Sequence, residues 1–233
     1  MAPENKNRDS SRNGFEFQKS LKERDPYRFL NLFRVERYMT RPLASLIVRA
    51  VFRTSVTPNQ LTVVSCVLGV ASGAAFLGGS HAYFILAGAL FQLSSIVDCA
   101  DGMLARSKDM CTRYGALLDL FCDRIVDFCV LTGIAYGQFR YSGDRYVLVL
   151  TLACTGLYFL EVTLYYLMRH YLQKDNIGQA AEARGLSIFG LLLFALFNRL
   201  DLFIMLGALV LVINLSSKII RVIRWRHPEN LSF

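Results

Sequence analysis

The sequence predicts an all-α polytopic membrane protein, with six transmembrane helices preceded by an N-terminal amphipathic helix at the membrane interface. Hydrophobic residues make up 54% of the 233 residues. Between Leu61 and Ile223 they form long blocks with few charges. A helix of about 20 apolar residues spans a bilayer core, whereas a soluble helix of that length shows a polar face. A basic stretch with apolar residues at helical spacing precedes the blocks.

The N-terminal quarter of the chain divides into two segments. Residues 1–25 are polar, lack the apolar stretch of a signal peptide, and are expected to form a mobile tail. Residues 26–54 interleave arginines with apolar residues at helical spacing, as in helices that lie on a membrane surface, and Pro42 is expected to break or kink this helix. Residues 1–55 hold twelve Lys and Arg against six Asp and Glu. Beside a membrane domain this charge favours an anionic lipid surface over nucleic acid as the partner.

A six-helix transmembrane catalytic domain is predicted for residues 55–225, followed by a short tail at 226–233. The first helix is expected to open at Thr57, because a Thr cap followed by Pro58 is a common helix start. The last two helices should form a hairpin with its turn at Asn198–Asp201. The predicted spans are 58–79, 82–104, 112–139, 145–168, 178–197 and 201–223.

The positive charges predict the orientation. Of the 26 Lys and Arg, 22 lie in the N-terminal segment, the links after the second and fourth helices, and the C-terminal end. Positive loops stay cytoplasmic, so both termini and the link between the second and third helices are expected there, in a multi-pass protein of the cell (inner) membrane.

Cysteine and histidine do not suggest a zinc site. The six cysteines form no CxxC pair, and the three histidines are scattered. The cysteines are interpreted as small buried residues.

Acidic residues occur where lipid-facing residues are expected. Asp98 and Asp101 lie three apart near the end of the second helix, and Asp119 and Asp123 lie four apart in the third. Each pair shares one face of its helix. A charged side chain in a membrane segment costs at least ~2.5 kcal/mol near mid-depth, so this grouping needs positive charge nearby. Oxygen-rich clusters of this kind suit Mg²⁺ or Mn²⁺, and four carboxylates are enough for two divalent ions.

Small residues accompany the acidic ones. Gly102, Ala105 and Gly115 fall one turn from the carboxylates and leave the helix faces slim, while Arg106 could pair with phosphate oxygens. Together they suggest a site for a nucleoside diphosphate. Two alternatives remain at this point: an ion or transport site, and a structural salt-bridge cluster. The basic residues available for the latter are Arg106, Lys108, Arg113 and Arg124.

The stretch Asp98-Cys-Ala-Asp101-Gly102-Met-Leu-Ala105-Arg106, eight residues, Gly115, three residues, Asp119, three residues, Asp123 resembles the signature of the CDP-alcohol phosphotransferases at every fixed position. Thr57-Pro58-Asn59-Gln60-Leu61-Thr62 resembles the family's opening of its first spanning helix.

The resemblance implies a reaction and roles for residues. Family members displace CMP from a CDP-linked donor with a hydroxyl acceptor and form a phosphodiester. Two divalent ions, Mg²⁺ or Mn²⁺, would be held by four acidic residues, and Asp123 would also act as general base. The residues implied at the nucleotide and diphosphate are Gly102, Ala105, Arg106, Gly115, Thr57 and Pro58.

The acceptor is less defined. Phosphatidylinositol-phosphate and phosphatidylglycerophosphate synthases carry a basic pattern after the fourth span that this sequence keeps only in charge, at Arg169, Lys174 and Arg184. These three are the candidates for contacting a phosphorylated acceptor or head group. Three hypotheses stay open: a phospholipid-forming enzyme, a CDP-inositol-dependent enzyme of the di-myo-inositol phosphate phosphate synthase kind, and a transporter or lipid-binding homologue. A homodimer is expected from the resemblance.

Overall fold

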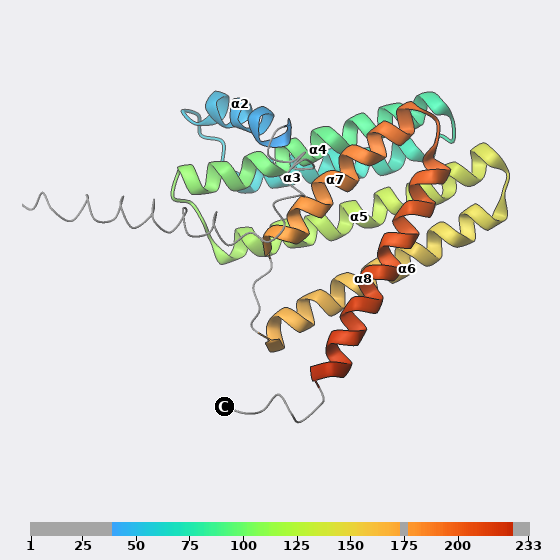
Figure 1. The fold of residues 1–233 in the computed structure, drawn as a ribbon. Helices are drawn as coiled ribbons and strands as arrows, with labels where there is room; N and C mark the ends of the chain where they lie inside the picture. Colours follow the sequence, from blue (N-terminus) through green and yellow to red (C-terminus); the bar gives the residue numbers. More distant parts are fainter. Residues whose placement is uncertain (1–38, 173–176, 226–233) are drawn as a thin grey trace, which may run out of the picture. The chain divides into compact units, whose positions relative to one another are not determined.

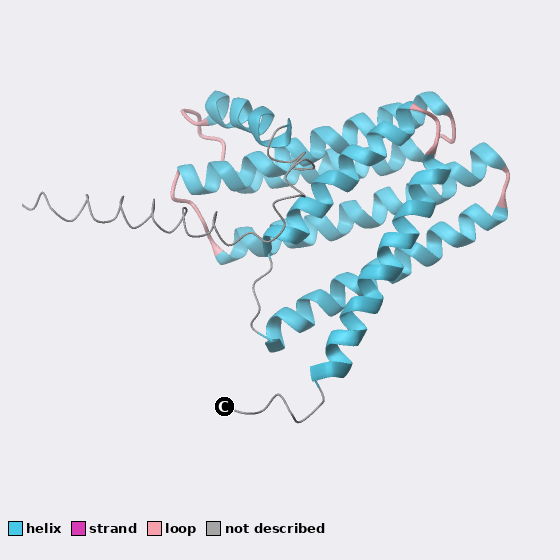
Figure 2. Ribbon diagram, viewed as in Figure 1, coloured by secondary structure: helices cyan, strands magenta, loops and turns pink. Residues whose placement is uncertain are grey.

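The structure, a computed structural model, describes residues 39–172 and 177–225, without the side chains of 167–172, 177–186, 217, 218 and 221–225. The described residues belong to one of two units of the chain, Val35–Phe233; the other is Met1–Arg34. Within the described ranges every regular element is a helix, which confirms the all-α prediction (Figure 2).

The helices agree closely with the predicted spans (Figure 1). A short helix, α2, precedes six long ones. Their bounds are α2 Arg41–Val51, α3 Pro58–Phe76, α4 His81–Ser107, α5 Arg113–Ser142, α6 Arg145–Leu172, α7 Ile177–Leu196 and α8 Leu200–Trp225. Asn198, with φ at 54°, lies in the turn before α8, which begins at Leu200, one residue before the predicted start at Asp201.

Among the described residues, three helices are long and apolar enough to cross a membrane: Pro58–Phe76, His81–Ser107 and Arg145–Tyr166. Ser187–Leu196 and Leu200–Ser216 are shorter apolar helices. Large apolar side chains stand exposed along several of them, among them Val67 at 63% and Val149 at 65%. Exposed apolar surface on this scale would be a liability in water. These are properties of a membrane protein; six crossings remain a prediction.

The predicted amphipathic helix over residues 26–54 is described only from residue 39 onward. Within α2, Pro42 sits in the first turn, where a proline costs no hydrogen bond. Ala44 and Val48 are buried in a cluster with residues of α3 and α4, while Leu46 is 58% exposed. Residues 1–38 and the tail after Trp225 lie outside the described residues, so the domain division stays a prediction.

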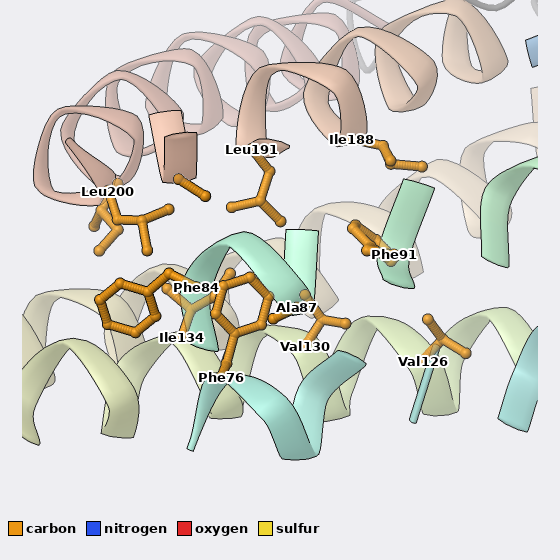
Figure 3. Packing of buried hydrophobic residues seen from close by; sticks show 12 residues of the cluster. Phe76, Phe84, Ala87, Phe91, Val126, Val130, Ile134, Ile188, Leu191 and Leu200 are labelled. Carbon is orange, nitrogen blue, oxygen red and sulfur yellow. The ribbon is translucent and has the colours of Figure 1, made fainter. Parts of the chain in front are cut away.

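Two apolar clusters hold the helices together. The larger one joins α3, α4, α5, α7 and the start of α8, and Figure 3 shows Phe76, Phe84, Ile134 and Leu191 turned toward one another. The smaller cluster joins α2 to α3 and to the part of α4 around Ile96–Leu104, which carries the acidic residues. α3 also packs closely on α4 and α5, and α6 packs on α5 and α8.

Candidate metal centre between α4 and α5

Local capping positions the two helices that carry the carboxylates. α4 ends at Ser107, and the Lys108 backbone N–H donates to the carbonyl of Leu104. Asp109, at φ 53°, turns the chain, and the Thr112 hydroxyl then accepts the Gly115 N–H at 2.9 Å to open α5. Because this link is short, the acidic end of α4 and the acidic start of α5 lie at the same end of the helix pair.

Three of the four predicted acidic residues come together. One carboxylate oxygen from each of Asp98, Asp119 and Asp123 lies within 4.8 Å of the other two, and all three residues are partly buried. Three carboxylates this close repel one another unless a cation lies among them. An all-oxygen donor set matches the preference of Mg²⁺ and Mn²⁺, so these residues fit a hard divalent cation.

Asp101 is not among the three residues whose oxygens lie within 4.8 Å of one another, although it is close enough to Asp119 and Asp123 to interact with them electrostatically. It is buried, and its Oδ2 accepts a hydrogen bond of 2.6 Å from the Thr62 hydroxyl of α3. Its role as a fourth metal ligand stays a prediction. Thr62 belongs to the predicted opening motif of the first helix, but the sequence predicts no role for it, because a contact across 39 residues leaves no periodic signal.

The predicted nucleotide residues lie around the same helix ends. The guanidinium of the exposed Arg106 lies over Gly102: a Cβ added to Gly102 would be 3.4 Å from Arg106 Nη1. A Cβ added to Gly115 would be 3.1 Å from Asn59 Oδ1. Ala105 is partly buried. Gly115 therefore meets the start of α3, and Asn59 is a neighbour for which the sequence analysis proposed no role.

The start of α3 is capped as predicted. The Gln60 N–H donates to the Thr57 hydroxyl and the Thr57 N–H donates to Gln60 Oε1 at 2.9 Å, while Pro58 is buried in the first turn. Lys108 ties the end of α4 to this region, since its Nζ donates to the carbonyls of Thr54 at 3.0 Å and Val56 at 2.9 Å. The nucleotide role of Thr57 and Pro58 stays a prediction.

A second polar group continues along α5. Arg124 Nη2 lies 3.1 Å from Asp127 Oδ2 and 3.8 Å from Asp123 Oδ2. Tyr158 of α6 donates to Asp127 Oδ2 at 2.8 Å and accepts from Arg124 Nη1 at 3.3 Å. Asp127 therefore has a close cationic partner in Arg124. The structural salt bridge that was considered for the acidic cluster is found at this residue.

The three candidate acceptor residues fall largely outside what is described. Arg169 lies in α6 and Arg184 in α7, with side chains outside the described set, and Lys174 is outside the described residues altogether.

Residues 55–215 match the family model for CDP-alcohol phosphatidyltransferase. The chain belongs to this family. The match contains the three clustered carboxylates, Asp101 and the capped start of α3. CDP-alcohol phosphatidyltransferases are transferases, so the family confirms the resemblance inferred from the signature.

Relatives of established name match up to half of the chain. The phosphatidylinositol phosphate synthase of Mycobacteroides abscessus is 32% identical over 116 residues, 50% of each chain. The bifunctional IPC transferase and DIPP synthase of Thermococcus kodakarensis is 38% identical over 102 residues, 44% of this chain and 22% of that protein. The chain thus spans about half the length of the former and about a fifth of the latter.

Solved structures share the fold. The phosphatidylinositol phosphate synthase of Mycobacterium tuberculosis with CDP-DAG bound aligns with a TM-score of 0.60 and 23% identity, over 84% of this chain and 98% of that one. The same enzyme in complex with manganese and citrate aligns with a TM-score of 0.63 and 22% identity, over 82% and 92%. That enzyme therefore has structures with CDP-DAG and with manganese on a fold similar to that of this chain.

Proposed function

We propose that this protein is a CDP-alcohol phosphotransferase that moves a substituted phosphate group from a CDP-linked donor to a hydroxyl acceptor and releases CMP. The observation that carries the proposal is the approach of Asp98, Asp119 and Asp123 to within 4.8 Å at the junction of α4 and α5. The cluster lies inside the region that defines the family.

The proposed metal site consists of these three residues and Asp101, and would hold two divalent ions, Mg²⁺ or Mn²⁺. When bound, the ions neutralise the diphosphate and stabilise the oxygen of the departing CMP. Metal-ligand roles are assigned to Asp101 from the family signature and to the other three from the signature and the geometry.

Asp123 is proposed to take the proton. The acceptor hydroxyl oxygen bonds to the phosphorus that bears the donor's substituent, and the bond from that phosphorus to the CMP oxygen breaks. The hydroxyl proton passes to the Asp123 carboxylate, as in other general-base steps. Arg106 would pair with phosphate oxygens beside Gly102, and Gly115, Ala105, Thr57 and Pro58 would line the nucleotide side.

The donor and acceptor are proposed from the relatives. By analogy with the phosphatidylinositol phosphate synthases, the donor would be a CDP-linked lipid and the acceptor a phosphorylated inositol, and the reaction would belong to phospholipid biosynthesis. Arg169, Lys174 and Arg184 would contact the phosphate of the acceptor. A CDP-inositol donor is the second candidate, because the bifunctional IPC transferase and DIPP synthases reach 38% and 43% identity over shorter stretches.

The membrane arrangement is part of the proposal. Six long helices would cross the cell membrane, with both termini and the carboxylate cluster on the cytoplasmic side, as the positive charges indicate. The protein would act as a homodimer, which the mass of the complex in mild detergent would test. A monomeric mass would contradict it.

The test is CMP release by the purified full-length protein with Mg²⁺ or Mn²⁺. The donors are CDP-diacylglycerol and CDP-inositol, and the acceptors are inositol phosphate, inositol and glycerol 3-phosphate. We expect metal-dependent CMP release with one donor, and its loss in Asp123→Asn. Asp144→Asn is the matched control, because Asp144 is exposed in the link before α6 and an Asn keeps its oxygen for the Tyr146 N–H. If no donor and acceptor pair gives CMP, the protein is not this enzyme, and a transporter or lipid-binding homologue becomes the better hypothesis.

A further inference from the structure

Arg124 stands between two carboxylates of its own helix. Its Nη2 is 3.1 Å from Asp127 Oδ2 but 3.8 Å from Asp123 Oδ2. The shorter distance is within reach of a charge-assisted hydrogen bond, and the longer one is not. The guanidinium therefore favours Asp127, although it lies close enough to Asp123 to compete for that carboxylate.

Two groups hold the guanidinium in this position. Asp127 is buried, at 7% exposure, and a buried carboxylate is costly without a cation and hydrogen-bond donors. Tyr158 supplies one donor, since its hydroxyl donates to Asp127 Oδ2 at 2.8 Å. The same hydroxyl oxygen accepts from Arg124 Nη1 at 3.3 Å, so one side chain of α6 contacts both members of the ion pair.

We propose that Asp127 and Tyr158 are positioning residues that hold the Arg124 guanidinium at 3.8 Å from Asp123 rather than in a close ion pair with it, so that a divalent cation can compete for the Asp123 carboxylate. Released from Asp127 and Tyr158, the guanidinium would move the short distance to Asp123 and form a close ion pair there. Metal binding would then have to break that pair. The inference rests on the proposed metal role of Asp123.

A charge-neutral substitution separates positioning from simple electrostatics. Tyr158→Phe removes the hydroxyl and changes no charge, whereas removing Asp127 alone would weaken cation binding through lost negative charge. We expect Tyr158→Phe to raise the Kd for Mn²⁺ by about threefold or more, a coupling within the range measured for contacting residues. The measurement is free Mn²⁺ by electron paramagnetic resonance, titrated into purified protein. Tyr146→Phe, on an 86% exposed tyrosine at the start of α6, should leave the Kd unchanged.

The same substitution in an Arg124→Gln background shows whether the effect passes through Arg124. With no guanidinium to hold, Tyr158→Phe should no longer change the Kd for Mn²⁺. An equal weakening in both backgrounds, or an unchanged Kd in the Arg124 protein, would overturn the proposal. If Tyr158→Phe does not fold, Asp127→Asn takes its place in the same pair of backgrounds. If Asp127→Asn raises the Kd for Mn²⁺ equally in both backgrounds, its effect is electrostatic and the positioning role is contradicted. A wild-type protein that binds no Mn²⁺ would instead count against the proposed function.

Discussion

The Thr62 hydroxyl of α3 donates to Asp101 Oδ2 of α4 at 2.6 Å, and both residues are buried. The same hydroxyl lies 3.2 Å from the carbonyl of Pro58, one turn earlier in α3. The single hydroxyl proton is best placed on the shorter contact, to the carboxylate. One predicted metal ligand is thus held by a hydrogen bond from a neighbouring helix.

Thr62→Val should destabilise the protein and weaken its activity. The valine keeps the shape but leaves a buried carboxylate without this donor, at a cost of about 1–3 kcal/mol. We expect a lower midpoint of thermal unfolding in detergent and slower CMP release. Thr62→Ser keeps the hydroxyl and should stay close to wild type. Equal midpoints for the Val and Ser variants would show that the hydrogen bond contributes little.

The close packing of α3 on α5 gives a second prediction. A Cβ added at Gly133 would overlap the carbonyl oxygen of Gly73, and one at Gly137 would overlap that of Phe76. Backbone atoms cannot move aside as a flexible side chain can, so alanine must force the helices apart. Gly133→Ala should cost about 1–3 kcal/mol of stability, the range for overpacking, and lower the unfolding midpoint.

Gly156→Ala and Gly207→Ala are the matched controls for this prediction. An added Cβ at either position has nothing within 4 Å, and alanine favours the helix slightly over glycine. Both should unfold at or above the wild-type midpoint. A Gly133→Ala protein as stable as these controls would mean that α3 and α5 are not packed this closely.

The helices could be predicted from the sequence because their signals are local. Apolar blocks gave their lengths, and the capping pattern of Thr57 and Pro58 gave the start of α3. The grouping of Asp98, Asp119 and Asp123 followed from helical spacing and a short link. What spacing could not decide is which way each side chain turns. Asp98 and Asp101 lie about 60° apart around α4, enough for Asp101 to turn toward α3 while Asp98 lies near α5.

Contacts between helices were beyond the sequence patterns for the same reason. Tyr158 meets Asp127 across 31 residues, in a helix whose apolar composition gave no sign of a polar partner. The sequence identifies Arg124 as a possible salt-bridge partner of the acidic residues. It could not pair Arg124 with Asp127, since Arg124 is close enough along α5 to reach several carboxylates.

Lys108 should matter for donor binding. Its ammonium donates to the carbonyls of Thr54 and Val56, just before the capped start of α3. Lys108→Met removes both hydrogen bonds and should loosen the segment that leads to Thr57. We expect the KM for the CDP-linked donor to rise severalfold with little change in kcat, because the carboxylates are untouched. Arg113→Met, at an exposed position, is the control for losing one positive charge nearby. A fall in kcat with unchanged KM would contradict this role.

Loss of one carboxylate should show directly in the metal requirement. Chelation with EDTA should abolish CMP release, and added Mg²⁺ or Mn²⁺ should restore it. Asp98→Asn keeps one side-chain oxygen but removes the negative charge of one of the three carboxylates whose oxygens lie within 4.8 Å of one another. The Mn²⁺ concentration for half-maximal activity should therefore rise by about tenfold or more, equivalent to about 1.4 kcal/mol of binding free energy. Asp144→Asn, which removes a charge far along the chain from the cluster, should leave that concentration unchanged. Because excess Mn²⁺ should partly rescue Asp98→Asn, a variant that stays inactive at every metal concentration while remaining folded would assign Asp98 to something other than metal binding.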